Sequence, residues 1–274
     1  MERLEHVIQR DPVTGRSFAN FVFDLAVLSL AEDGEQVDCR WLDDRRDPDL
    51  TGAQTLRFAP RAWQEWIKLG DPVLTRIRRR VAASRVRTAG EQRPVPGSSE
   101  DRLLEKIYRQ FDGNKVQFEL LASRVAGAVF RNRGGGYAEG WLTRGSGDGG
   151  ADFVGRLDIG TGGAMVRLVV LGQAKCVAPT SSISAEQIAR VVARLRRGWI
   201  GVFVTTGAYS RAAQLEIIED QYPILLIDGR HLAEEVRRLS FESHGGDVDA
   251  LLAAITTGYP AAVSARRPKE VLNL

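Results

Sequence analysis

The chain has 274 residues, of which 43% are hydrophobic and 27% charged, and its formal net charge at pH 7 is +3. These values are typical of a soluble globular protein with one large or two modest domains. The first residues carry no apolar signal segment, so we expect a cytoplasmic protein. Two cysteines and three histidines exclude a disulfide framework and argue against zinc chemistry or a histidine-based triad.

The first 95 residues are predicted to form a small α+β domain. Apolar residues at helical spacing predict a helix over residues 17–31, and alternation with period two predicts a strand over residues 36–42. A second short strand is predicted over residues 55–59. Pro60 and Gly70 bracket a predicted helix, and Asp71 and Pro72 begin another that runs into a basic segment.

The basic segment, residues 76–93, carries seven arginines and one acid, Glu91. Residues 1–75 have the opposite sign, with 9 basic and 14 acidic side chains and therefore a balance of −5. Dense positive charge suits a phosphate backbone, although a solvated helix face explains it equally well. The candidate DNA-binding residues are Arg76, Arg78, Arg79, Arg80, Arg85 and Arg87.

Residues 88–99 are rich in proline and glycine and predict the boundary between a domain of residues 1–95 and one of residues 96–274. Beyond it, helices are predicted from a Ser98 cap to Phe111, from Lys115 onward, and over residues 184–197, 209–220, 230–239 and 247–257. Strands are predicted over residues 137–143, 151–157, 166–174, 199–205 and 223–227. This order predicts an α/β fold, a mixed β-sheet flanked by helices.

Three polar side chains are predicted to meet at one edge of this sheet. A glycine-rich turn over residues 145–150 delivers Asp152 to the start of a strand, and the next apolar strand ends in Gln173 and Lys175. The latter two are two residues apart and therefore point to the same face. An acid, an amide oxygen and an amine suit metal-assisted cleavage of a phosphodiester, with Mg²⁺ as the cation. Taken singly, each is more often an ordinary turn or strand-end residue.

Glu119 is a weaker candidate. It lies one turn into the helix that begins near Lys115, beside an apolar stripe that includes Phe118 and Leu121. From there it could reach the sheet edge and hold a water on the metal, but glutamates on helix surfaces usually have no such role. The chain has no Walker A motif and no dinucleotide fingerprint, so nucleotide-binding enzymes of those classes are not indicated.

Together these motifs resemble the Mrr-like restriction endonucleases, a branch of the PD-(D/E)XK nuclease superfamily. Five segments follow the family's order across about residues 112–240. They are Phe118-Glu119, residues 145–152, Gln173-Ala174-Lys175, Thr205-Thr206-Gly207 and Leu226-Ile227-Asp228-Gly229. Each is weak alone, but five in order form a specific pattern.

The resemblance implies a restriction-endonuclease-like fold and a Mg²⁺-dependent endonuclease that cuts double-stranded DNA. Asp152 would be the metal-binding carboxylate, Lys175 the catalytic lysine and Glu119 the helix acid. Gln173 stands where many relatives carry Glu or Asp, and it would be the second metal ligand. This single core carboxylate departs from the wider superfamily and leaves the number of metal ions open.

The leading hypothesis is a restriction endonuclease that defends against foreign DNA, with residues 1–95 recognising the site. Cutting both strands needs two active sites, so we expect a homodimer. One version cuts unmethylated DNA beside a cognate DNA methyltransferase. The other cuts modified DNA, for which Trp41, Trp63 and Trp66 are candidates for an aromatic cage, although the spacing of the last two is more typical of a core. A structure-specific repair or recombination nuclease and a non-catalytic DNA-binding protein are further alternatives.

Overall fold

The computed structural model describes residues 3–10, 15–24, 30, 34–70, 72–73, 75–76, 83, 85–143, 151–160, 162–219 and 222–274. The chain divides into two compact units, Met1–Arg85 and Val86–Leu274. The segment from Val86 to Ser98 therefore belongs to the larger unit. Among the described residues, no helix is long and apolar enough to span a membrane.

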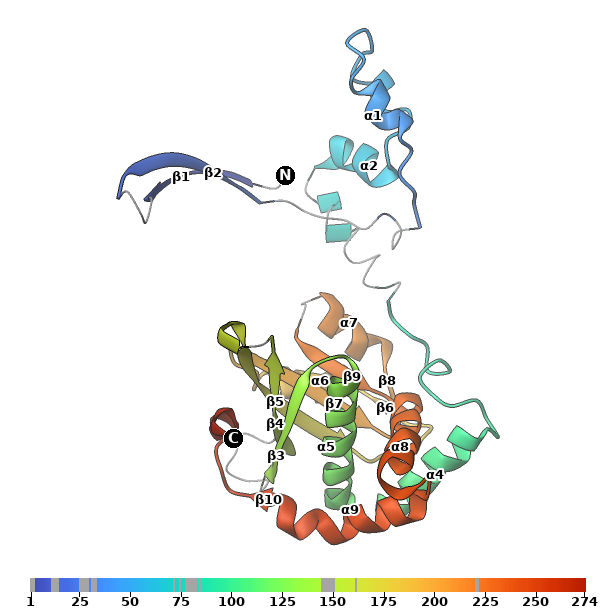
Figure 1. Ribbon diagram of the computed structural model, residues 1–274. Coiled ribbons are helices and arrows are strands. Elements are labelled where there is room, and N and C mark those ends of the chain that lie inside the picture. The colour runs from blue at the N-terminus through green and yellow to red at the C-terminus, as the bar shows by residue number, and fades with distance from the viewer. Residues whose placement is uncertain are drawn as a thin grey trace. The chain divides into compact units, whose positions relative to one another are not determined.

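The first unit contains an antiparallel hairpin and short helices (Figure 1). Its elements are β1 (Arg3–Arg10), β2 (Ser17–Asp24), α1 (Arg40–Asp44), the 3₁₀ turn η1 (Gln54–Leu56) and α2 (Arg61–Leu69). The predicted α2 is confirmed, with Pro60 as its N-cap and Gly70 as its C-cap. Gly70 has φ 70°, a conformation that glycine adopts without a steric penalty.

Three other predictions for this unit are wrong. Residues 17–24 form a strand because they pair along their whole length with β1, and this pairing outweighs their helical spacing. Residues 40–44 form the helix α1 and not a strand, and residues 54–56 form η1. The helix predicted to start at Asp71 lies largely outside the described residues.

The second unit is an α/β domain with a six-stranded mixed sheet (Figure 1). Its strands in the sheet are β3 (Gly136–Thr143), β4 (Phe153–Ile159), β5 (Val166–Lys175), β7 (Trp199–Thr205), β9 (Ile224–Ile227) and β10 (Val263–Ser264), in the order β10-β3-β4-β5-β7-β9. β3, β4 and β5 form an antiparallel meander, whereas β7 and β9 run parallel to β5. A separate two-stranded ladder pairs β6 (Ser182–Ile183) with β8 (Ala208–Tyr209). The predicted mixed sheet is confirmed.

Helices cover both faces of this sheet. They are α4 (Ser99–Phe111), α5 (Lys115–Asn132), α6 (Ala185–Val192), α7 (Arg211–Glu219), α8 (Gly229–His244) and α9 (Val248–Ala262), followed by the 3₁₀ segment η3 (Pro268–Asn273). On one face, α4, α5, α8 and α9 enclose the main core, which includes the fully buried Phe118 and Phe153. On the other face, α6 and α7 pack over Phe203, and η3 packs over Val154 and Leu171. Each helix and strand predicted for this unit is present, although α6 ends at Val192 and not at residue 197, and β6, β8 and β10 were not predicted. Ser98 caps α4 as expected.

Candidate active site

The backbone of Asp152 is held by the strands on both sides of it. Its N–H donates to the carbonyl of Gly172 at 2.8 Å, and its carbonyl accepts the N–H of Thr143 at 3.0 Å. One carboxylate oxygen, Oδ2, accepts the backbone N–H of Ala174 at 2.7 Å and a hydrogen bond from Nε2 of Gln173. The sheet therefore brings Asp152 and Gln173 into direct contact.

The register of the sheet places the predicted trio on one face. Val154 and Leu171 belong to the apolar cluster on the face that η3 covers. Because side chains alternate along a strand, Asp152, Gln173 and Lys175 point to this same face. The predicted common face of Gln173 and Lys175 agrees with this register.

Burial disfavours the anionic forms of both candidate acids. Burial raises the pKa of Asp152, while the N–H of Ala174 and the positive charge of Lys175 oppose that rise. Burial and the negative charge of Asp152 together raise the pKa of Glu119 from 4.5 to about 8. Glu119 lies on α5, which packs on the opposite face of the sheet, and its charge interacts with that of Asp152. The two carboxyl groups are thus close enough to repel each other when both are ionised, a repulsion that a bound cation would relieve.

The donor set of this site fits a hard divalent cation. Across the described residues, no three His, Cys, Asp or Glu side chains are grouped as a metal site, so a cation here would depend on an amide oxygen as well as acids. Asp152 and Gln173 supply one carboxylate and one amide oxygen, which are ligands that Mg²⁺ accepts, and Glu119 adds a second carboxyl group nearby. In this structure the Gln173 amide oxygen lies 3.4 Å from Nη1 of Arg194. A half-turn of the amide would exchange its oxygen and nitrogen, and would turn the oxygen toward Asp152, where it could bind the cation.

The Thr-Thr-Gly segment fastens the end of the strand that carries Lys175. Thr205 and Thr206 are completely buried. The hydroxyl of Thr205 donates to the carbonyl of Lys175 at 2.9 Å, and the hydroxyl of Thr206 donates to the carbonyl of Val177. Both threonines therefore support the site and do not line it.

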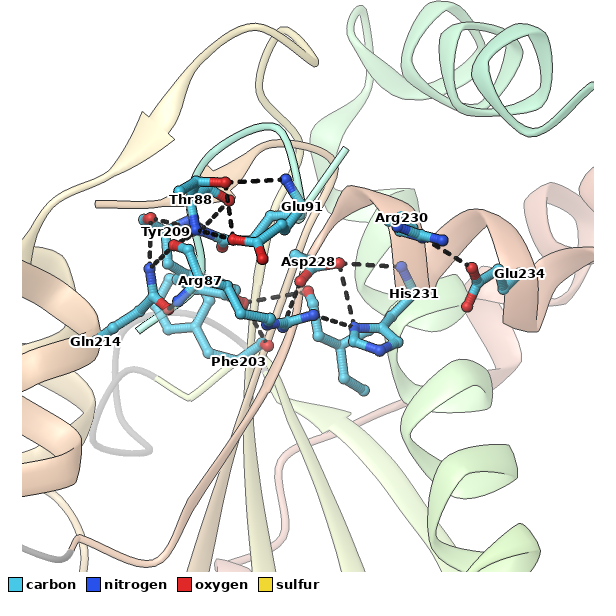
Figure 2. Close-up of polar contacts among 12 residues, drawn as sticks. Arg87, Thr88, Glu91, Phe203, Tyr209, Gln214, Asp228, Arg230, His231 and Glu234 are labelled. Atoms are coloured by element: carbon cyan, nitrogen blue, oxygen red, sulfur yellow. Dashed lines mark hydrogen bonds and ion pairs between the residues drawn. The ribbon is translucent and has the colours of Figure 1, made fainter. Parts of the chain in front are cut away.

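Asp228 of the Leu-Ile-Asp-Gly segment has a structural role of the same kind (Figure 2). This carboxylate is completely buried, caps α8 by accepting the N–H of His231 at 3.0 Å, and pairs with Nη2 of Arg87 at 2.6 Å. Gln214 binds the backbone N–H and carbonyl of Arg87, each at 2.9 Å. These contacts fix the segment around Arg87 to the rest of the second unit.

The predicted DNA-binding arginines have different surroundings. Arg76 forms an ion pair with Glu65 at 2.5 Å within the first unit. Arg87 lies in the second unit, where its guanidinium binds Asp228. Arg85 is the last residue of the first unit. Arg78, Arg79 and Arg80 lie outside the described residues, as does the glycine-rich turn before Asp152.

The three candidate cage tryptophans do come together in the first unit. The ring centroids of Trp41 and Trp63 are 5.7 Å apart, and those of Trp63 and Trp66 are 5.3 Å apart. These separations are typical of rings packed directly against each other, roughly 4.5–7 Å between centroids. Such packing leaves no gap for a base between adjacent rings and favours the core interpretation.

Arg194 is a site residue that the sequence did not reveal. It contacts Gln173 through the guanidinium, and its positive charge also opposes the rise in the pKa of Asp152. The contact joins two segments 21 residues apart, and no motif or periodicity singles out an arginine just beyond a helix end.

The chain is similar in sequence and fold to known restriction endonucleases. The family model described as "Restriction endonuclease" (Mrr_cat) matches residues 117–236, which contain all five motif segments. The solved structure of MspJI restriction endonuclease in complex with a 27-mer oligonucleotide is 58% identical, with a TM-score of 0.67, over 100% of this chain and 61% of that chain. The DNA modification-dependent restriction endonuclease AspBHI is 25% identical, with a TM-score of 0.53, over 93% of this chain and 61% of that chain. No curated protein matches the chain.

In both fold and sequence, the second unit resembles a restriction endonuclease domain. Its resemblance to the Mrr-like restriction endonucleases is confirmed. The chain spans 61% of the length of each of the two solved chains.

Proposed function

We propose that this protein is a Mg²⁺-dependent restriction endonuclease that hydrolyses phosphodiester bonds of double-stranded DNA at a recognised site, in defence against foreign DNA. The observation that carries the proposal is the contact between Asp152 and Gln173 at the sheet edge where Lys175 ends the neighbouring strand. The similarity to two restriction endonucleases supports it.

The reaction assigns a separate task to each side chain. A water oxygen bonds to phosphorus while the bond from phosphorus to the leaving deoxyribose oxygen breaks; the water loses a proton, and the leaving oxygen gains one. Asp152 and Gln173 would hold the cation, which supplies positive charge against the phosphate oxygens. Lys175 would steady the attacked phosphate, and Glu119 would orient the attacking water.

Recognition of DNA is proposed for the first unit and the basic segment. Arg76, Arg78, Arg79, Arg80 and Arg85 would contact phosphates, while Arg87 would do so in addition to its bond with Asp228. Cleavage of both strands would require a homodimer with one active site on each strand. A cognate DNA methyltransferase belongs only to the version that cuts unmethylated DNA.

Dependence on a modified base is the second candidate for how the target is chosen. The name of AspBHI describes that protein as DNA modification-dependent. The match to AspBHI covers 93% of the present chain. This likeness favours cleavage of modified DNA over cleavage of an unmethylated sequence.

The test is cleavage of methylated and unmethylated plasmids by the full chain with Mg²⁺. Lys175→Ala removes the proposed phosphate contact, and Lys106→Ala is the matched control because Lys106 pairs with Asp249 on the surface. Fragments from methylated plasmid alone, lost in Lys175→Ala and kept in Lys106→Ala, would establish the modification-dependent version. Fragments from unmethylated plasmid would establish the other version. Absence of cleavage for both plasmids would contradict the proposed function.

A further inference from the structure

Arg194 lies beside the candidate site, just after the end of α6. Its backbone N–H donates to the carbonyl of Val191 at 3.0 Å, which closes the last turn of α6. The side chain of Val191, on the inner side of α6, is buried in the cluster around Phe203. Leu195 packs against the apolar cluster that contains Ala151. Ala151 directly precedes Asp152. The flanking residues thus anchor Arg194 on the face that carries Asp152.

The side chain of Arg194 reaches the reacting end of the site. Nη1 of Arg194 lies 3.4 Å from the amide oxygen of Gln173, and the amide nitrogen of Gln173 donates to Asp152. The three groups form a row of guanidinium, amide and carboxylate. Because the positive charge of Arg194 also acts on Asp152, it lies within electrostatic range of any phosphate brought to that carboxylate.

The chemistry of the reaction favours a second positively charged side chain beside Lys175. The phosphate brings negative charge to a site that already holds Asp152 and Glu119, and more charge develops on its oxygens as the water attacks. Lys175 is a compact point charge. A guanidinium offers five N–H donors in a planar fork, a geometry that can bind two oxygens of one phosphate.

We propose that Arg194 is a substrate-contacting residue, whose guanidinium binds a non-bridging oxygen of the phosphate that is cut. This inference rests on the proposed nuclease function. Its contact with Gln173 holds the guanidinium at the site before DNA arrives. When the Gln173 amide turns its oxygen to the cation, the phosphate replaces that contact. Arg194 would act together with Lys175, from its position just after the end of α6.

Three variants separate this role from a structural one. Arg194→Ala removes charge and fork, whereas Arg194→Lys keeps the charge and loses the fork. Arg190→Ala is the matched control, because Arg190 lies one turn earlier on α6, is 68% exposed, and pairs with Glu186 on the helix surface at 2.7 Å. Thermal unfolding of each variant monitors the fold.

The experiment measures single-turnover cleavage by the full chain with Mg²⁺, and duplex affinity by fluorescence anisotropy in EDTA. We expect Arg194→Ala to cleave about a hundredfold more slowly, the range seen when one transition-state donor is lost. Arg194→Lys should recover part of the rate, and Arg190→Ala should match the wild type. Added guanidinium ion should raise the rate of Arg194→Ala and leave that of Lys175→Ala unchanged.

The proposal is overturned if Arg194→Ala cleaves at the wild-type rate or loses no more than Arg190→Ala. It is also overturned if the rate of a folded Arg194→Ala does not respond to guanidinium ion. A wild-type chain that does not cleave DNA would contradict the proposed function separately. In that case the duplex affinity would decide whether Arg194 contacts a phosphate. The proposal requires Arg194→Ala to bind the duplex more weakly than Arg190→Ala does.

Discussion

Gly172 and Phe153 pair across β5 and β4, and a Cβ added to Gly172 would stand 2.1 Å from the ring of Phe153. Phe153 is completely buried and follows Asp152, while Gly172 precedes Gln173. The ring of Phe153 therefore lies against the bare α-carbon of Gly172, directly beside the two polar residues of the site. No side chain other than hydrogen fits at position 172 without displacing the ring.

Gly172→Ala is expected to lower both stability and cleavage. Overpacking of this kind typically costs about 1–3 kcal/mol, and displacement of Phe153 would also move Asp152. Thermal unfolding and the cleavage rate measure the two effects. Gly113→Ala is the control, because a Cβ at Gly113 meets nothing within 4 Å. Equal melting temperatures for both variants would contradict the packing described.

The raised pKa of Glu119 predicts a pH-dependent stability. Between pH 4.5 and about 8, the folded chain holds a proton on Glu119 that the unfolded chain releases. The free energy of unfolding should therefore fall as pH rises through this range. Glu119→Gln should flatten this dependence, as measured by urea unfolding at several pH values with a chelator present.

Glu105→Gln is the matched control for this measurement, because Glu105 pairs with Arg109 on the surface of α4. It should keep the pH dependence of the wild type. If Glu119→Gln has the same dependence as the wild type, Glu119 does not hold the extra proton.

Arg87 and Asp228 are expected to contribute to stability as a coupled pair. Arg87→Ala leaves the buried carboxylate of Asp228 without its cation, and we expect a loss of about 3 kcal/mol, the low end for breaking a buried pair, because Arg87 is itself 38% exposed. Asp228→Asn keeps an N-cap acceptor for α8 and removes the charge. The double variant should lose less than the sum of the two single losses.

Arg230→Ala provides the comparison for that cycle, since Arg230 pairs with Glu234 at 3.2 Å on the exposed side of α8 (Figure 2). An exposed pair contributes at most about 1 kcal/mol. Chemical denaturation measures all four variants. Losses in the double variant that simply add would show that Arg87 and Asp228 do not interact.

The two cysteines should differ sharply in reactivity. Cys39 is exposed, whereas Cys176 is buried, and its burial raises the pKa of the Cys176 thiol to about 11. Since the thiolate is the reactive form, a thiol reagent should label Cys39 in the folded chain and reach Cys176 only after denaturation. Mass spectrometry of labelled peptides, with Cys39→Ser as the control, measures this. Rapid native labelling of Cys176 would contradict its buried position.

The second unit could be predicted closely from the sequence because its local patterns agree with its tertiary contacts. The apolar run of β5, the Ser98 cap of α4 and the alternating order of strands and helices all point to the same fold. The sequence also predicted that Asp152, Gln173 and Lys175 share one face of the sheet, because strand ends and residue spacing are local features. Their direct contact, however, depends on the register of β4 against β5.

The first unit shows where local patterns fail. Phe18, Phe21 and Val22 have helical spacing, but pairing with β1 makes this segment a strand. Short segments such as residues 36–42 hold too few residues for their alternation to outweigh other contacts. Arg194 was missed for a related reason, because its contact with Gln173 exists only once α6 packs on the sheet.

The most direct test of the central claim is Mg²⁺-dependent cleavage of plasmid DNA by the full chain and by Asp152→Asn. Asparagine keeps the size of the side chain and can still accept the N–H of Ala174, so the fold should persist while the charge is lost. We predict that the wild type cleaves with Mg²⁺ and not with EDTA, and that Asp152→Asn is at least about a hundredfold slower. Cleavage by Asp152→Asn at the wild-type rate, or cleavage that EDTA does not stop, would contradict the account.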